Sequence, residues 1–167
     1  MKIIKVKTDS KNYDIKVGHD LLGSTPLKKL VSQKDILLIV DNKVPELLIN
    51  KLKINLKKSS SKKINSIKIN ASENNKNMSY LAKVYDFLIR KNYSRDCVIF
   101  GVGGGITCDM TGFIASTFLR GVDFVLVPTT LLSQVDASIG GKTGVNHKGF
   151  KNMIGTFNQP VQVIIDT

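Results

Sequence analysis

Three short apolar runs alternate with segments of helical character along this chain, and this alternation restricts its fold more than any other feature. The runs cover residues 36–40, 97–100 and 124–127. An unbroken apolar run of this length is typical of a strand buried on both faces of a parallel sheet. After the first run, Pro45 can begin a helix that continues to about Lys57, because proline fits the first helical turn. Strands that alternate with helices predict the α/β class, with a Rossmann-like, mostly parallel sheet and flanking helices.

The remaining pattern adds elements to this sheet without changing its class. Residues 3–6 and 13–17 indicate a hairpin, and Asn77 can cap a helix that carries apolar side chains on one face. The other expected elements are strands at 64–69 and 161–165, helices at about 106–118 and at 131–135 with Thr130 as its cap, and loops at 59–63 and 140–150. A length of 167 residues is that of one domain, and we expect residues 1–167 to form it.

A glycine-rich segment at residues 101–160 is the part of the chain best suited to bind a ligand. The glycine turn at 101–105 follows an expected strand and precedes an expected helix, whose first N–H groups could receive a pyrophosphate. The G-x-G-x-x-G fingerprint is not met, because Ile106 or Cys108 stands at the third glycine position. A tight strand-to-helix connection is the alternative. Asp109, expected in the first helical turn, either serves a site or only interacts with the helix dipole.

Polar residues after this turn suit an anionic substrate. Two lysines and an arginine near a glycine-rich loop could bind phosphate or carboxylate, although each could also be an ordinary surface residue. The residues in question are Arg120, Asp136, Lys142, Lys151 and Asn152. Residues 141–143 resemble the end of a P-loop, but Asp136 occupies the position of the required first glycine. A P-loop nucleotidase is therefore not expected.

Charge and composition exclude several function classes. The formal charge is +12, but the lysine block at 57–63 is interleaved with serines and the chain has few arginines, so we expect no nucleic-acid partner. No apolar run reaches the roughly 18 residues of a membrane span, and the start lacks a secretory signal. We therefore expect no membrane partner, a cytoplasmic location, and Cys97 and Cys108 as buried, reduced thiols. His19 and His147 lack partners at metal-ligand spacing, so no metal-binding residue is expected within the chain.

Three stretches of the glycine-rich part together resemble the 3-dehydroquinate synthases. They are GVGGGITCDMTGFIAS from residue 101, FLRGVDFVLVPTTLLSQVDASIGGKTGVNH from residue 118, and KNMIG from residue 151. The resemblance is dense over residues 97–166, and it is looser but collinear before that, through Asp41 and the segment at 71–76. The combination is specific to this family, whereas single pieces such as the triple glycine recur in related polyol dehydrogenases.

The resemblance implies an activity and its cofactors. The family converts 3-deoxy-D-arabino-heptulosonate 7-phosphate to 3-dehydroquinate and phosphate in the shikimate pathway, which leads to chorismate and the aromatic amino acids. The reaction is a phosphate-eliminating lyase reaction with transient oxidation by NAD. The resemblance also implies a divalent metal, zinc or cobalt, held by residues beyond this chain, a phosphorylated sugar acid as the substrate, and a homodimer for the full-length enzyme.

The same resemblance assigns roles to individual residues. Cys108 stands where the family usually has glycine, so its thiol should point away from the cofactor, and residues 70–72 lack the usual Pro, Gly or Asp. The catalytic positions are Asp136, Lys142, Asn152 and Arg120, the last acting across a dimer interface. The NAD positions are Asp41, Ala71, Ser72, Glu73, Asn74, Asn75, Lys76, Gly104, Gly105, Ile106, Thr107, Cys108, Asp109, Thr129, Thr130, Lys142 and Lys151.

The length of the chain bears on its activity. The family's metal ligands, one Glu and two His, lie beyond the equivalent of Thr167, so the chain resembles the N-terminal half of the enzyme. We expect this half to be inactive on its own. The alternatives are a related sugar-phosphate cyclase or polyol dehydrogenase, and an NAD-binding remnant without catalysis.

Overall fold

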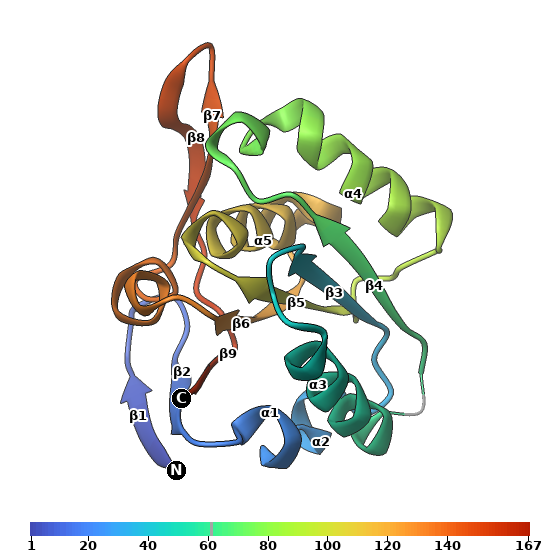
Figure 1. Cartoon of the computed structure of the whole chain (residues 1–167). Helices are drawn as coiled ribbons and strands as arrows, with labels where there is room; N and C mark the ends of the chain where they lie inside the picture. Colours follow the sequence, from blue (N-terminus) through green and yellow to red (C-terminus); the bar gives the residue numbers. More distant parts are fainter. Residues whose placement is uncertain (61) are drawn as a thin grey trace.

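The computed structural model describes residues 1–60 and 62–167, and its centre is a seven-stranded sheet (Figure 1). The strand order is β1-β2-β9-β6-β5-β3-β4, and every neighbouring pair is parallel except β1 and β2. The strands are β1 (Lys2–Val6), β2 (Tyr13–Gly18), β3 (Ile36–Asp41), β4 (Ile64–Ile69), β5 (Val98–Gly103), β6 (Asp123–Pro128) and β9 (Gln162–Asp166). The predicted α/β class with a Rossmann-like, mostly parallel sheet is thereby confirmed.

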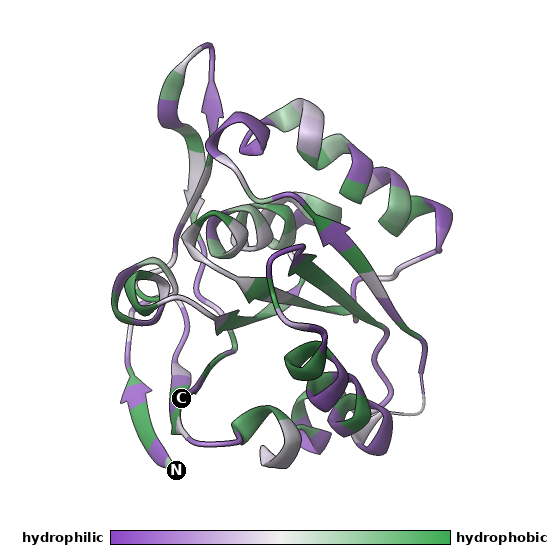
Figure 2. Cartoon of the chain, viewed as in Figure 1, coloured by the Kyte–Doolittle hydropathy of each residue, from purple (hydrophilic) through white to green (hydrophobic). Residues whose placement is uncertain are grey.

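Helices cover both faces of this sheet. On one face lie α4 (Met78–Arg90) and α5 (Gly105–Thr117), and on the other lie α1 (Leu21–Ser24), α2 (Lys28–Val31) and α3 (Glu46–Ser59) (Figure 1). Figure 2 shows hydrophobic central strands, and hydrophilic residues along α3 and α4. Each apolar strand alternates its side chains between two hydrophobic clusters, one under each layer of helices. Among the described residues, no helix is long and apolar enough to cross a membrane.

Several local predictions are confirmed, with shifted boundaries. The Asn77 side chain caps α4 by accepting a hydrogen bond from the Tyr80 N–H at 2.9 Å. Thr130 Oγ1 accepts from the Ser133 N–H at 3.3 Å, and the helical turn that follows contains a π-helical segment, η3 (Ser133–Ala137). Helix α3 extends two residues past the predicted end at Lys57. Ser61, in the predicted loop at 59–63, lies outside the described residues.

The loop predicted at 140–150 is wrong. Strands β7 (Lys142–His147) and β8 (Phe150–Phe157) pair antiparallel and form a hairpin that stands beside the start of α4 (Figure 1). Gly144 lies opposite Gly155, and a Cβ atom on Gly155 would lie 2.3 Å from the Thr143 carbonyl oxygen. These glycines therefore serve close pairing of two backbones, and they do not make this segment a loop.

The glycines of β5 have a similar packing role. A Cβ atom on Gly101 would lie 2.5 Å from Thr111 Oγ1, and one on Gly103 would lie 2.5 Å from Thr107 Oγ1. Both threonines belong to α5, so glycine lets this helix lie directly against the strand. The strand also runs to Gly103, beyond the predicted end at residue 100, and only Gly104 separates it from α5.

Candidate active site

A crevice for a ligand is expected where β3 and β5 end side by side. β4 lies on one side of β3 and β5 lies on the other. The connections that follow β3 and β4 therefore lead to opposite sides of β3, which makes the carboxyl end of β3 a topological switch point. Ligands bind at such switch points in open α/β sheets. Asp41 ends β3, and its Cβ atom lies 2.9 Å from where a Cβ on Gly103 would be. On the opposite side, the Thr129 N–H donates to the Gly103 carbonyl at 2.9 Å.

The N-terminus of α5 opens into this crevice. Gly104 is the N-cap residue, and within the described part of the chain no side chain caps this helix end. The first N–H groups of α5 therefore keep their capacity to bind an anion, which the helix dipole also favours. Gly104, Gly105 and Ile106 are partly exposed here.

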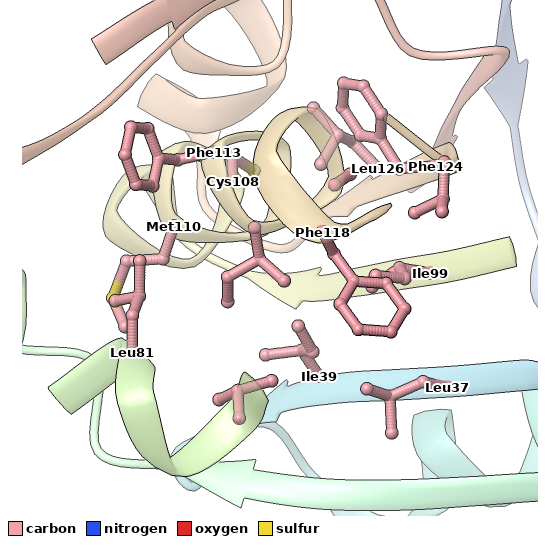
Figure 3. Packing of buried hydrophobic residues seen from close by; sticks show 14 of the residues in the cluster. Leu37, Ile39, Leu81, Ile99, Cys108, Met110, Phe113, Phe118, Phe124 and Leu126 are labelled. Atoms are coloured by element: carbon pink, nitrogen blue, oxygen red, sulfur yellow. The ribbon is translucent and has the colours of Figure 1, made fainter. Parts of the chain in front are cut away.

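Two of the predicted cofactor positions at this helix end point into the core. The side chains of Thr107 and Cys108 are buried, and Figure 3 shows Cys108 among core side chains of α5 and the sheet. Burial raises the pKa of the Cys108 thiol to about 12, so the thiol stays protonated and unreactive. Any contact with a ligand from these two residues would come from the backbone. The predicted state of Cys97 and Cys108 as buried, free thiols is confirmed.

A buried ion pair lies next to the helix end. The Lys76 ammonium donates to the Asp109 carboxylate and, at 2.5 Å, to Asn152 Oδ1. The side chain of Lys76 is 4% exposed and that of Asp109 22%. Asp109 lies beyond the first turn of α5, so its predicted place in the first turn is wrong, and the alternative of a role limited to the helix dipole is weakened. Burial raises the pKa of the Asp109 carboxyl, and the hydrogen bond from Lys76 partly offsets this rise.

Further polar contacts, closer to the surface, join the segment that contains Lys76 to the hairpin. Glu73 belongs to the single turn η1 (Glu73–Asn75), and its carboxylate accepts from Asn146 Nδ2 at 2.8 Å. Lys151 Nζ lies 3.7 Å from Glu73 Oε1, with both side chains largely exposed. The hydrogen bond from Asn146 lowers the pKa of Glu73 below its usual range.

The hairpin and α5 enclose a cavity beside the ion pair. Its volume is about 400 Å³. Polar groups of Asp109, Lys142 and Asn152 and the apolar side chains of Met153 and Phe157 line it. The mixture of a few fixed polar groups with apolar walls is typical of a small-molecule site.

The structure brings most of the predicted site residues to this crevice. Lys76, Asp109, Asn152 and Lys142 surround or line the cavity, and Glu73 and Lys151 lie just outside it. Asp136 is exposed on η3, where its charge also helps to raise the pKa of Asp109. The residues at 71–72 lead into η1, which contains Asn74 and Asn75.

Arg120 does not join them. It ends the short turn η2 (Phe118–Arg120), after the C-terminus of α5. Helix α5 has 13 residues, so Arg120 lies about 20 Å from the glycine turn. Arg120 is not among the residues that line the cavity with Lys142 and Asp109.

Sequence reasoning missed Asn146, Met153 and Phe157. Asn146 lies in the segment predicted as a loop, and its side chain joins η1 to β8. The only sequence signal is a polar residue near the end of a strand, β7, that the sequence does not predict. Among the residues described, no group of three or more His, Cys, Asp or Glu side chains could hold a metal ion.

Comparisons with known proteins agree with this geometry. The family model of the 3-dehydroquinate synthase N-terminal region matches residues 66–167. The chain is 44% identical to 3-dehydroquinate synthase of Pelagibacter ubique, over 98% of this chain and 45% of that protein. It is 41% identical to the enzyme of Hydrogenovibrio crunogenus, over 100% of this chain and 46% of that protein. The chain thus spans about half the length of the curated relatives it matches.

Solved structures of related enzymes share the fold. A 2-deoxy-scyllo-inosose synthase superposes with a TM-score of 0.90 at 23% identity, over 99% of this chain and 47% of that one. The 2-epi-5-epi-valiolone synthase of Streptomyces hygroscopicus, solved with NAD⁺ and Zn²⁺ bound, has a TM-score of 0.82 at 30% identity, over 99% of this chain and 45% of that one. Because the family model covers more than half of the sequence, the chain belongs to the 3-dehydroquinate synthase family.

Proposed function

We propose that this chain supplies the NAD-binding part of a 3-dehydroquinate synthase, which converts 3-deoxy-D-arabino-heptulosonate 7-phosphate to 3-dehydroquinate and phosphate. The observation that carries the proposal is the buried Lys76–Asp109 pair beside an uncapped helix end at the switch point of the sheet. Identity to curated 3-dehydroquinate synthases is 41–44% over the chain. Identity to the two cyclases of solved structure is 23% and 30%, so we favour the synthase over a related cyclase.

The residues at the crevice fit NAD. The N–H groups of Gly105 and Ile106 lie at the uncapped start of α5, where they could bind the pyrophosphate. Asp109 offers a carboxylate that can accept hydrogen bonds from ribose hydroxyls, and Lys76 keeps that carboxylate in place. Thr129, Thr130 and Asp41 border the crevice at the ends of β6 and β3. NAD, when bound, would supply reversible hydride transfer.

The substrate would lie in the cavity beneath the hairpin. Lys142 lines it and Lys151 lies at its outer side, so both can attract a phosphate or carboxylate. Asn152 offers polar contacts, and Asp136 lies near enough to influence Asp109. Arg120 lies outside the cavity lining, after the C-terminus of α5, and we propose that it acts across the interface of a homodimer in the full-length enzyme.

We propose that residues outside the described part of this chain bind the divalent metal. The described part of the chain holds no suitable group of His, Cys, Asp and Glu ligands, so a catalytic metal does not fit here and no step of the reaction is assigned to it. What the chain itself contributes is the binding and orientation of the cofactor, the fixed charges of Lys76 and Asp109, and one wall of the substrate cavity.

Titration with NAD tests the proposal. We expect the folded chain to bind NAD, and Asp109→Asn to weaken this binding by about 1.5–3 kcal/mol, roughly 10- to 150-fold, because a hydrogen bond to a charged group is lost. The affinity is measured by calorimetry and the folded state by circular dichroism. Asp86→Asn, an exposed carboxylate on α4, is the matched control and should leave the affinity unchanged. A folded chain that gives no heat at millimolar NAD would refute the proposal.

We expect the 167-residue chain alone to release no phosphate from the heptulosonate phosphate in the presence of NAD and Zn²⁺. The reason is that the described residues offer no metal-ligand set, and groups that act as a unit do not give proportional rates when part of them is removed. The assay is a phosphate-release measurement, with full-length Pelagibacter ubique enzyme as the positive control. Turnover that persists in the chain and disappears in Lys142→Ala would contradict this expectation.

A further inference from the structure

We propose that Asn146 is a positioning residue that holds Lys76 and Asn152 in register with Asp109. This inference rests on the proposed function for its consequence in NAD binding. The Asn146 N–H donates to the Lys76 carbonyl at 2.7 Å, and Asn146 Oδ1 accepts from the Asn152 N–H at 2.9 Å. Asn146 thus binds the main chain of both Lys76 and Asn152, and the side chains of these two residues are hydrogen-bonded to each other.

An irregularity in the hairpin makes this possible. The register of β7 and β8 shifts between Val145 and His147, so Asn146 is released from regular pairing with β8. Its backbone forms a bridge with Asn77 at the start of α4 instead. The extra residues lie on β8, because residues 151–153 stand opposite Asn146 alone on β7, and such a bulge disrupts regular pairing locally.

The side chain of Asn146 requires both a donor and an acceptor. Its Nδ2 donates to Glu73 Oε2 at 2.8 Å and to the Glu73 carbonyl at 3.2 Å, while Oδ1 accepts from Asn152. A carboxylate at this position would keep the acceptor but lose the donor. It would also place a negative charge against Glu73.

Asn152 needs this support. Its φ angle is +55°, a left-handed conformation that asparagine adopts more readily than other residues with a Cβ atom but that is still uncommon. The hydrogen bond to Asn146 Oδ1 fixes this residue from the outside, and Lys76 contacts its side chain from the inside. The alternative tie, Lys151 to Glu73, spans 3.7 Å between exposed groups and is a weak constraint.

A reversal of the hydrogen-bond polarity tests the proposal. Asn146→Asp removes the donor toward Glu73, Glu73→Gln keeps an acceptor there, and the double variant restores one donor, now on Gln, to one acceptor, now on Asp. At pH 7.5 we expect Asn146→Asp to lower the NAD affinity by at least about 10-fold. We expect the double variant to recover most of this loss relative to Glu73→Gln alone. His147→Gln, at the next position of β7, is the control and should bind NAD like the wild type.

Hydrogen exchange of the Asn152 amide gives a readout that does not depend on NAD. We expect faster exchange in Asn146→Asp and slower exchange again in the double variant, with exchange in the central strands β3 and β5 unchanged. An Asn146→Asp protein with wild-type exchange and wild-type NAD affinity would overturn the proposal, as would purely additive effects in the double variant. If the wild type binds no NAD, the proposed function fails, while the exchange experiment still decides the role of Asn146.

Discussion

Replacement of Lys76 by Met is expected to lower the free energy of unfolding by about 3 kcal/mol at neutral pH. Removal of one partner of a buried ion pair costs about 3–5 kcal/mol, because it leaves an uncompensated buried charge. The lower end applies here since the Asp109 side chain is 22% exposed and can gain water. Methionine keeps most of the volume of the lysine stem, so the loss comes from the charge and its hydrogen bonds.

The deficit of Lys76→Met should depend on pH. Burial already raises the pKa of Asp109 in the wild type, against the lowering effect of Lys76, and loss of Lys76 will raise it further. A carboxyl with a raised pKa in the folded state destabilises the protein above that pKa and ceases to do so once it is protonated. The difference between variant and wild type should therefore shrink as the pH falls from about 7 to about 4. Urea denaturation over this pH range measures it.

A second substitution separates stability from function. Lys76→Met/Asp109→Asn contains no buried charge at this place, and we expect it to regain most of the stability, because a buried pair can be replaced by neutral groups at little cost. NAD binding should stay weak in the same protein, since the ribose acceptor of the proposed site is missing. A Lys76→Met protein as stable as the wild type at pH 7 would show that the Asp109 carboxylate is already protonated or solvated in the folded chain.

The sheet could be predicted from the sequence because its strands are buried on both faces. The runs at 36–40, 97–100 and 124–127 have no polar residue that could face water, which is typical of strands buried on both faces. The extension of β5 through Gly103 was not predictable from the strand pattern alone. Gly101 and Gly103 look like a turn in sequence, yet each is needed because α5 lies directly on the strand.

The site could be predicted only in part, for a similar reason. The chemistry of Lys76, Asp109 and Asn152 was assigned by family resemblance, and the structure then brought three separate segments together around one ammonium. The hairpin was missed because residues 142–157 show neither hydrophobic alternation nor a common turn sequence. The role of Asn146 was not predicted either, because it depends on a bulge in this hairpin that the local sequence does not indicate.

The contact between α5 and the hairpin predicts that the effect of Gly112→Ala on the free energy of unfolding depends on the residue at position 143. A Cβ atom on Gly112 would lie 2.3 Å from Thr143 Cγ2, and Thr143 cannot rotate freely because its Oγ1 bonds the Thr156 carbonyl at 3.1 Å and hydroxyl at 2.8 Å. We therefore expect Gly112→Ala to lower the free energy of unfolding by about 2–3 kcal/mol, the scale of overpacking.

Thr143→Ser removes only the clashing methyl group and keeps the hydroxyl. In this background the Cβ atom of residue 143 would still lie 3.2 Å from the added Cβ, a tight contact that is offset by the helix propensity of alanine, worth up to about 1 kcal/mol, so Gly112→Ala should change the stability little. Gly23→Ala is the control, because its Cβ would meet nothing closer than 3.8 Å, and it should not destabilise the protein. Urea denaturation of the four proteins of the cycle gives the coupling between the two positions. An equal loss from Gly112→Ala in both backgrounds would mean that the Thr143 methyl does not set the distance between α5 and β7, and the cavity wall would then owe its position to other contacts.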